Sequence, residues 1–181
     1  PDFWQMLGRG ETLVYRGDSE RAWGLVRRHW WPLHRSFLMQ VEIIYVLMHH
    51  LRGRLALTAA AGAQSWILRS WYRGWARRSA RRLEAREGAY TTGIARMLQG
   101  ELAATADDRE RAIERYANAR EILQSTHTKF YATAAKRRLG ELRGGDAAGE
   151  LVEEADAWLR SRGVRSPEKM AAMATARGQE R

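Results

Sequence analysis

The stretch GELAATADDRERAIERYANA, residues 100–119, describes two helices that have to pack closely against each other. Gly100 is followed by Ala112 after twelve residues, by Tyr116 after sixteen and by Ala119 after nineteen. Glycine and alanine let two antiparallel helices approach where a larger side chain would keep them apart. The tyrosine ring covers this contact, and the second alanine lets the next helix approach. The spacing therefore predicts a tight helical hairpin.

These offsets are typical of the tetratricopeptide repeat, in which stacked helix pairs bury a continuous core. Gly10, Gly53 and Gly140 take the place of the first glycine in three further helices, so that the glycines are 43, 47 and 40 residues apart. Two of these units are degenerate, because Ser65 and Val152 stand where alanine is expected. We predict an all-α fold of tetratricopeptide-like antiparallel helix pairs, an α-solenoid of about eight helices, with all four glycines at close crossings. A plain α-helical bundle is the alternative.

The rest of the chain also favours helices, since Ala, Leu, Arg and Glu dominate and only three prolines occur. Trp31-Pro32 predicts the end of one helix, and Ser166-Pro167 predicts the start of a short last one. We assign residues 1–163 to the repeat array and residues 164–181 to a short terminal helix with a tail that is frayed from Thr175. Apolar spacing of three and four residues predicts one long helix that is buried on much of its circumference: Phe37, Val41, Ile44, Met48, Leu51 and Leu55.

Several kinds of site are excluded by what the sequence lacks. The absence of cysteine excludes disulfides and thiolate metal sites and fits a reducing compartment, so we expect a cytoplasmic protein. The longest apolar run, Ile43–Met48, is far shorter than the roughly 18 residues that span a bilayer, so we expect no membrane insertion. The chain has no phosphate-binding loop, dinucleotide fingerprint, kinase motif or metal-ligand spacing of histidines, so we expect no catalysis, metal or cofactor. Because it starts at Pro1, we expect it to be a piece of a longer protein.

The chain is strongly basic, with a formal net charge of +10, and 28 of its 31 basic residues are arginines. A GC-rich genome explains such a bias, and the alternative is a basic face for an acidic partner or nucleic acid. Trp66, Trp71 and Trp75 share a helix with several arginines, where they either stack nucleic-acid bases or fill space between helices. Arginines recur every fourth residue on this helix and predict a basic ridge: Arg69, Arg73, Arg77 and Arg81.

A solenoid of helix pairs presents a concave groove that is lined by the first helix of each pair. We expect a protein partner that binds in this groove to touch several of its inward residues. An assembly surface, where exposed tryptophans meet a second copy of the chain, is a further option. Counted from the repeat glycines, six residues occupy the inward positions: His50, Arg54, Met97, Glu101, Arg137 and Glu141.

Three further parts of the chain carry a resemblance to a known family. They are YRGD at 15–18 with WWPLHRS at 30–36, HLRGR at 50–54, and EADAWL at 154–159 with GVRSPEKM at 163–170. In these parts the chain resembles the C-terminal tetratricopeptide-repeat region of bacterial signalling proteins that join a serine/threonine kinase domain to a STAND-type ATPase domain. The resemblance covers nearly the whole chain. It implies a sensory or scaffolding role, with the kinase and ATPase chemistry in upstream domains.

The leading hypothesis is a non-catalytic protein–protein interaction and regulatory module, the C-terminal part of a bacterial signal-transduction kinase or ATPase. Its partner is then another protein or another domain of the same parent protein. The alternative is a nucleic-acid-binding helical repeat that uses the arginine ridge. Retention on DNA or heparin that falls steeply with salt separates the two hypotheses.

Overall fold

The computed structural model describes residues 3–176, and every regular element within that range is helical. The predicted all-α fold is therefore confirmed. The described range contains nine α-helices, one more than predicted, and one short 3₁₀ helix: α1 (Phe3–Tyr15), α2 (Ser19–Arg35), η1 (Phe37–Gln40), α3 (Glu42–Gly62), α4 (Trp66–Glu84), α5 (Ala89–Ala104), α6 (Arg109–Ser125), α7 (Lys129–Arg143), α8 (Asp146–Ser161) and α9 (Pro167–Thr175).

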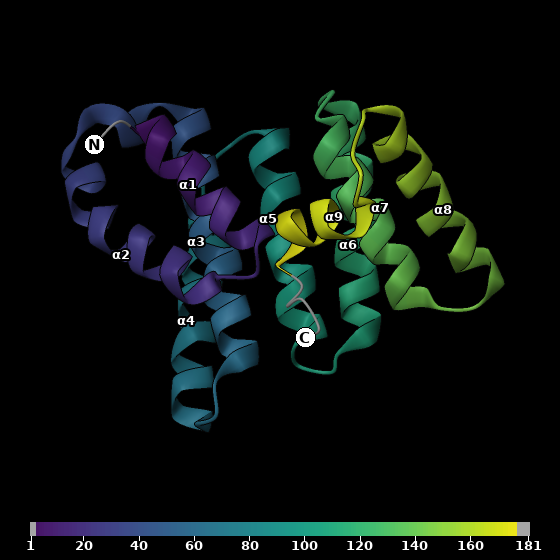
Figure 1. The fold of residues 1–181 in the computed structure, drawn as a ribbon, viewed down its shortest axis with the longest axis horizontal. Coiled ribbons are helices and arrows are strands. Elements are labelled where there is room, and N and C mark those ends of the chain that lie inside the picture. Colours follow the sequence, from purple (N-terminus) through teal and green to yellow (C-terminus); the bar gives the residue numbers. More distant parts are fainter. Residues whose placement is uncertain (1–2, 177–181) are drawn as a thin grey trace.

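Consecutive helices fold back on each other and form four pairs, α1 with α2, α3 with α4, α5 with α6, and α7 with α8 (Figure 1). Each pair also packs against the next pair along the chain, as helical repeats do. The last helix leaves this order. After α8 the chain turns back and places α9 across α1, α5 and α7, which are the first helices of three pairs (Figure 1).

Short turns with defined caps separate the helices. Gly17 adopts a positive φ of 79° after α1, and Asp18 caps α2 by accepting a hydrogen bond from the backbone N–H of Arg21. Asp108 caps α6 in the same way. Ser166-Pro167 opens α9, as predicted. Local turn chemistry thus sets where these hairpins begin and end.

The junction between α2 and α3 differs from the prediction. Helix α2 continues for three residues beyond Trp31-Pro32, although this dipeptide predicts its end. A proline in the last turn removes only one N–H donor, and Leu33, 8% exposed, anchors that turn in the core. Phe37 and Val41, which apolar spacing assigns to the long helix, precede α3 and are 82% and 48% exposed. The 3₁₀ turn η1 therefore interrupts the periodicity before α3 starts.

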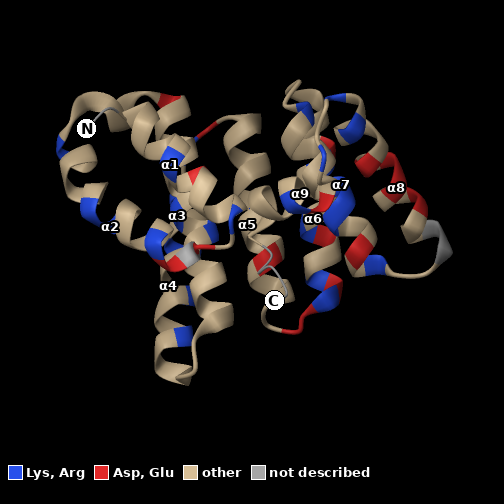
Figure 2. Cartoon of the chain, in the orientation of Figure 1, with Lys and Arg blue, Asp and Glu red and all other residues tan. Residues whose placement is uncertain are grey.

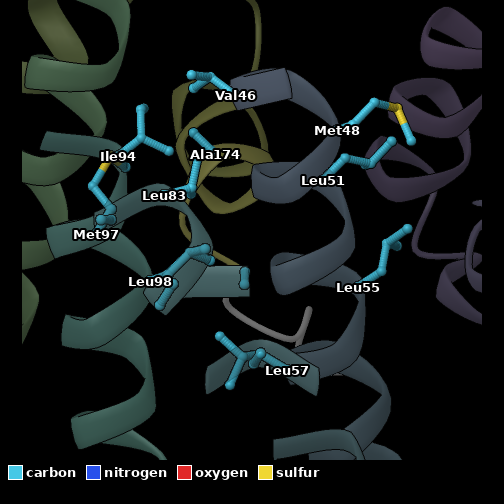
Figure 3. Packing of buried hydrophobic residues seen from close by; sticks show 14 of the residues in the cluster. Val46, Met48, Leu51, Leu55, Leu57, Leu83, Ile94, Met97, Leu98 and Ala174 are labelled. Atoms are coloured by element: carbon cyan, nitrogen blue, oxygen red, sulfur yellow. The ribbon is translucent and has the colours of Figure 1, made fainter. Parts of the chain in front are cut away.

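Helix α3 lies at the centre of the core and packs against α1, α2, α4 and α5. Met48, Leu51 and Leu55 on α3 are each at most 1% exposed, and Figure 3 shows them in the same packed cluster as Leu98 of α5. The prediction of a long helix buried on much of its circumference is confirmed from Ile44 onward.

The hairpin predicted from Gly100 has the expected close crossing. A Cβ atom on Gly100 would lie 2.7 Å and 2.8 Å from two ring carbons of Tyr116. That ring is fully buried, and its hydroxyl donates to Glu101 at 2.8 Å, so it has no space to move away. Gly140 is equally tight, since its Cβ would lie 2.9 Å from the side chain of Val152, at the predicted offset of twelve.

The other two repeat glycines also lie at close crossings, but with partners that the repeat pattern does not predict. A Cβ on Gly53 would lie 2.7 Å from Leu98 of α5, and one on Gly10 would lie 3.2 Å from Leu51 of α3. Because α3 extends nine residues beyond Gly53, Ser65 falls at the N-terminal cap of α4 and not opposite the glycine. The assignment of Ser65 as a partner position is therefore wrong.

The end of the described chain is packed against the array. Thr175 and Ala176 are only 4% and 5% exposed, so fraying does not begin at Thr175 as predicted. The rest of the predicted tail, residues 177–181, lies outside the described residues. Helix α9 contributes Ala171 and Ala174 to the same buried cluster as α3 and α5.

Replacing Gly100 by alanine should lower the free energy of unfolding by about 1–3 kcal/mol, because the new methyl group overlaps the fixed Tyr116 ring. Gly74 in α4 is a matched control, since a Cβ there meets no atom within 4 Å. Gly74→Ala should raise the free energy of unfolding by about 0.5–1 kcal/mol through helix propensity. Urea denaturation measures both, and equal stabilisation of the two variants would contradict the crossing at Gly100.

Candidate functional site

The residues predicted to line the groove lie on α3, α5 and α7, the first helices of three pairs. The groove is not open, because α9 lies across α5 and α7 (Figure 1) and accepts a hydrogen bond from Arg54 of α3. Glu141 is half-buried, and the other five are between 1% and 9% exposed: His50, Arg54, Met97, Glu101 and Arg137.

Helix α9 is held in the groove by apolar and polar contacts. Its Ala171 and Ala174 are 3% and 1% exposed, and Figure 3 shows Ala174 with the buried residues of α3 and α5. The guanidinium of Arg54 on α3 donates to the backbone carbonyl of Met173 and forms an ion pair with Glu11 of α1. One buried arginine thus connects the first and the last helix of the structure.

His50 lies beneath α9, one helical turn before Arg54. Its ring meets the ring of Tyr131 on α7 edge to face, with 5.4 Å between the ring centroids. Burial, and then the charge of Arg54, lower the pKa of His50 well below 6.5, while a hydrogen bond to the backbone of Ala174 raises it. The imidazole is therefore neutral at neutral pH and helps to form the floor on which α9 rests.

An ion-pair network joins α5, α7 and α8 beside the groove. Arg138 of α7 donates two hydrogen bonds to the carboxylate of Glu101, at 3.0 Å each, and a third to Glu141, also at 3.0 Å. Arg137 pairs with Glu141 and with Asp156 of α8, the latter at 2.7 Å. Removing one partner of a buried pair costs about 3–5 kcal/mol, so this network fixes the walls of the groove.

The predicted groove residues thus hold the array together in the folded chain. His50 and Arg54 lie directly under α9, and the charged residues of α5 and α7 bind each other. Arg138 is as central to this network as Glu101, although the sequence did not indicate it. Its partner lies 37 residues away in the sequence, so no local pattern identifies the pair. Contact of these residues with a partner remains a prediction for a state in which α9 has left the groove.

The predicted basic ridge lies along α4, where Arg69, Arg77 and Arg81 are exposed and Arg73 is half-buried. Arg69 lies apart from the others and donates to the backbone carbonyl of Ala63 at 3.2 Å. The other three border a depression of about 400 Å³ that also contains Glu84 and Asp108. Helices α5 and α6 add three more arginines to its lining: Arg96, Arg111 and Arg115.

Charge is unevenly distributed over the array. Helix α4 carries six arginines and one glutamate, whereas carboxylates follow one another along α8 (Figure 2). Within the arginine-rich depression, Glu84 is paired with Arg96 at 2.9 Å, and Asp108 caps α6 by accepting a hydrogen bond from the backbone N–H of Arg111. The remaining arginines of the depression therefore give the α4 side of the molecule an excess of positive charge.

His49, the neighbour of His50 on α3, contacts different helices. Its ring packs against Trp30 of α2 and Tyr45, with centroids 5.3 Å and 4.4 Å away. The side chain is 3% exposed, and neither ring nitrogen has a hydrogen-bond partner among the described residues. Burial, and then the charge of Arg52, lower the pKa of His49 from 6.5 to about 3.

Acid should destabilise the folded chain below pH 6.5. The unfolded chain then takes up a proton at His49, whereas the folded chain does not until the pH approaches a value of about 3. Because the unfolded state binds more protons in this window, the free energy of unfolding falls by about 1.4 kcal/mol for each pH unit and each such histidine. His49→Phe keeps an aromatic ring without a titrating group and should reduce this slope in urea denaturation. An unchanged slope would contradict a buried neutral His49.

No three His, Asp or Glu side chains of residues 3–176 are grouped so that they could hold a metal ion. None of the helices in this range has the length and apolar character that a membrane span requires. Comparison of the chain with protein-family models, with curated proteins and with solved structures gives no match. The resemblance to bacterial signalling proteins stays a prediction from the sequence.

Proposed function

We propose that the chain is a non-catalytic protein–protein interaction and regulatory module whose groove binds one amphipathic helix at a time. The observation that supports this proposal is the position of α9. This nine-residue helix lies across α1, α5 and α7 and buries Ala171 and Ala174. Helix-in-groove binding is a common mode of peptide recognition. In the folded chain the chain's own last helix occupies the groove, and a partner helix takes its place.

The contacts of α9 suit such an exchange. It is short, and its buried residues have small side chains, each of which adds little apolar area: Pro167, Ala171, Ala174 and Thr175. Its contact with Arg54 uses the backbone carbonyl of Met173, a group that any helix of suitable length provides. A longer partner helix that keeps small side chains at these positions and adds apolar contacts beyond them therefore gains more from the groove than α9 does.

A partner helix has to compete with α9 for the groove, and this competition regulates its binding. A short connection, residues 162–166, links α8 to α9, so the effective concentration of α9 at the groove is high. A partner has to be abundant, or α9 has to be released by another event, before the groove becomes available. The resemblance to kinase–ATPase signalling proteins supports a partner in the same parent protein, with the array as its cytoplasmic C-terminal part.

The variant Ala174→Asp in the complete chain tests this proposal. A carboxylate at a position that is 1% exposed is costly to bury, so α9 should leave the groove. A fluorescein-labelled peptide of residues 164–176 should then bind the variant and not the unchanged chain, as measured by fluorescence anisotropy.

Lys169→Asp provides a control on the same helix, because Lys169 is exposed and its replacement leaves the buried face of α9 unchanged. This variant should exclude the peptide as the unchanged chain does. Failure of the peptide to bind an Ala174→Asp chain that retains its helical circular dichroism would count against the proposal. Equal binding to all three chains would do so as well.

The arginine-rich depression at α4, α5 and α6 favours a second candidate function, nucleic-acid binding. Six arginines line this depression, which has a volume of about 400 Å³. Contacts of arginine with phosphate depend strongly on the salt concentration. None of the described residues that line the depression is aromatic, so phosphate contacts alone support this candidate function.

The triple replacement Arg73→Gln, Arg77→Gln and Arg81→Gln tests the second function. If the depression holds phosphates, the variant should elute earlier from heparin and from immobilised DNA. The slope of log affinity against log salt should fall by about one for each lost phosphate contact. Identical elution of the variant and the unchanged chain would remove nucleic acid as a function of this surface.

A further inference from the structure

A cavity of about 360 Å³ lies between α2, α3 and α4. None of its lining residues belongs to α9, to the six groove residues or to the basic ridge. Its volume falls in the range of about 300–1,000 Å³ that is typical of sites for small molecules. It is therefore a separate feature of the molecule, which neither the groove nor the basic depression explains.

The walls of this cavity are aromatic, because five of the eight tryptophans line it. Trp71 meets Trp23 and Trp75 edge to face, with centroids 6.2 Å and 5.8 Å away. Trp31 and Trp71 are still 73% and 47% exposed, so their faces are available at the mouth. Concave aromatic surfaces of this kind bury a flat apolar ring well, since stacking adds to the area removed from water.

The polar groups of the cavity are cationic or neutral. Arg27, Arg52, Arg78 and Arg82 line it, and no Asp or Glu is among its lining residues in the described chain. The guanidinium carbon of Arg52 lies 3.7 Å from the ring centroid of Trp30 on one side. On the other side it lies 4.0 Å from the centroid of Trp75. This double cation–π contact holds Arg52 in place, and an anion is the group that four arginines at one cavity would attract.

His49 is a second, independent sign of a missing ligand. It lines the cavity, is 3% exposed, and has no hydrogen-bond partner in the described chain at either ring nitrogen. Buried polar side chains without any partner are rare in native proteins. A neutral imidazole has one donor and one acceptor, and the described residues satisfy neither of them.

We propose that this cavity binds a small organic anion that carries a flat aromatic ring, with the ring against the exposed Trp31 and Trp71 and the anionic group at Arg78 and Arg82. Inorganic phosphate or acetate would leave the aromatic walls unfilled, and a neutral aromatic molecule would leave the arginines without a counter-charge. Both a nucleotide and an aromatic carboxylate have the required chemistry, and the probes below distinguish them.

Isothermal titration calorimetry on the complete chain tests the proposal with AMP and 2-naphthoate as probes. Adenosine, 2-naphthylmethanol and inorganic phosphate are the matched compounds that lack either the charge or the ring. At least one aromatic anion should bind once per chain and about tenfold more tightly than its neutral counterpart and than phosphate. AMP binding without naphthoate binding identifies a nucleotide site, and the reverse identifies an aromatic carboxylate site.

The paired variants Arg78→Gln/Arg82→Gln and Arg77→Gln/Arg81→Gln locate the site. Both remove two exposed arginines from α4, but only the first pair lines the cavity. The first pair should weaken binding about tenfold or more, and the second should change it less than about twofold. In NMR spectra the indole N–H signals of Trp71 and Trp75 should shift on binding, while those of Trp4 and Trp158 should not.

Three results would overturn the proposal. One is the lack of saturable binding by either aromatic anion. Another is equal binding of the neutral counterparts, which would leave only an apolar surface. The third is equal weakening by both variant pairs, which would mean attraction to the general charge of the chain. None of these results bears on the groove, since the cavity and α9 share no residue.

Discussion

Arg54 is 2% exposed in the middle of the array, where an unpaired charge is costly. Its partners are Glu11 of α1 and the backbone carbonyl of Met173 in α9, which belong to the first and the last helix. Because Arg54 of α3 bonds to both α1 and α9, these three helices hold each other in place. If α9 moved away, Arg54 would keep only Glu11 and would become accessible to water.

A groove that is filled by its own chain differs from an open repeat surface. Its walls are held by the buried network around Glu101, Arg138 and Asp156, so they keep their spacing whichever helix lies between them. Its floor is made of neutral His50 and apolar residues. Such a groove accepts a helix by shape and by backbone contacts such as those of Arg54 and His50, and for this reason we place recognition there and regulation in the competition with α9.

Helix α4 separates two basic surfaces. Successive residues of an α-helix are about 100° apart, so the pairs Arg77-Arg78 and Arg81-Arg82 divide between two sides. Arg78 and Arg82 border the tryptophan cavity, whereas Arg77 and Arg81 border the depression shared with α5 and α6. One helix therefore borders an aromatic cavity, where we propose an anion site, on one side and a wide polar surface on the other. The high arginine content has different consequences in the two places.

The sequence by itself determined the helices, most of their caps and the tight hairpin at Gly100, because periodicity, capping and the Gly100–Tyr116 contact act within one or two neighbouring helices. The residues that it predicts to line a groove lie on the first helices of three pairs. Only the tertiary structure decided that α9 fills the groove, that Arg138 pairs with Glu101, and that tryptophans of α2 and α4 enclose Arg52. These contacts join residues as far as 119 positions apart. They depend on the length of each helix and on which side chains of different helices come into contact. No local sequence pattern encodes either of these properties.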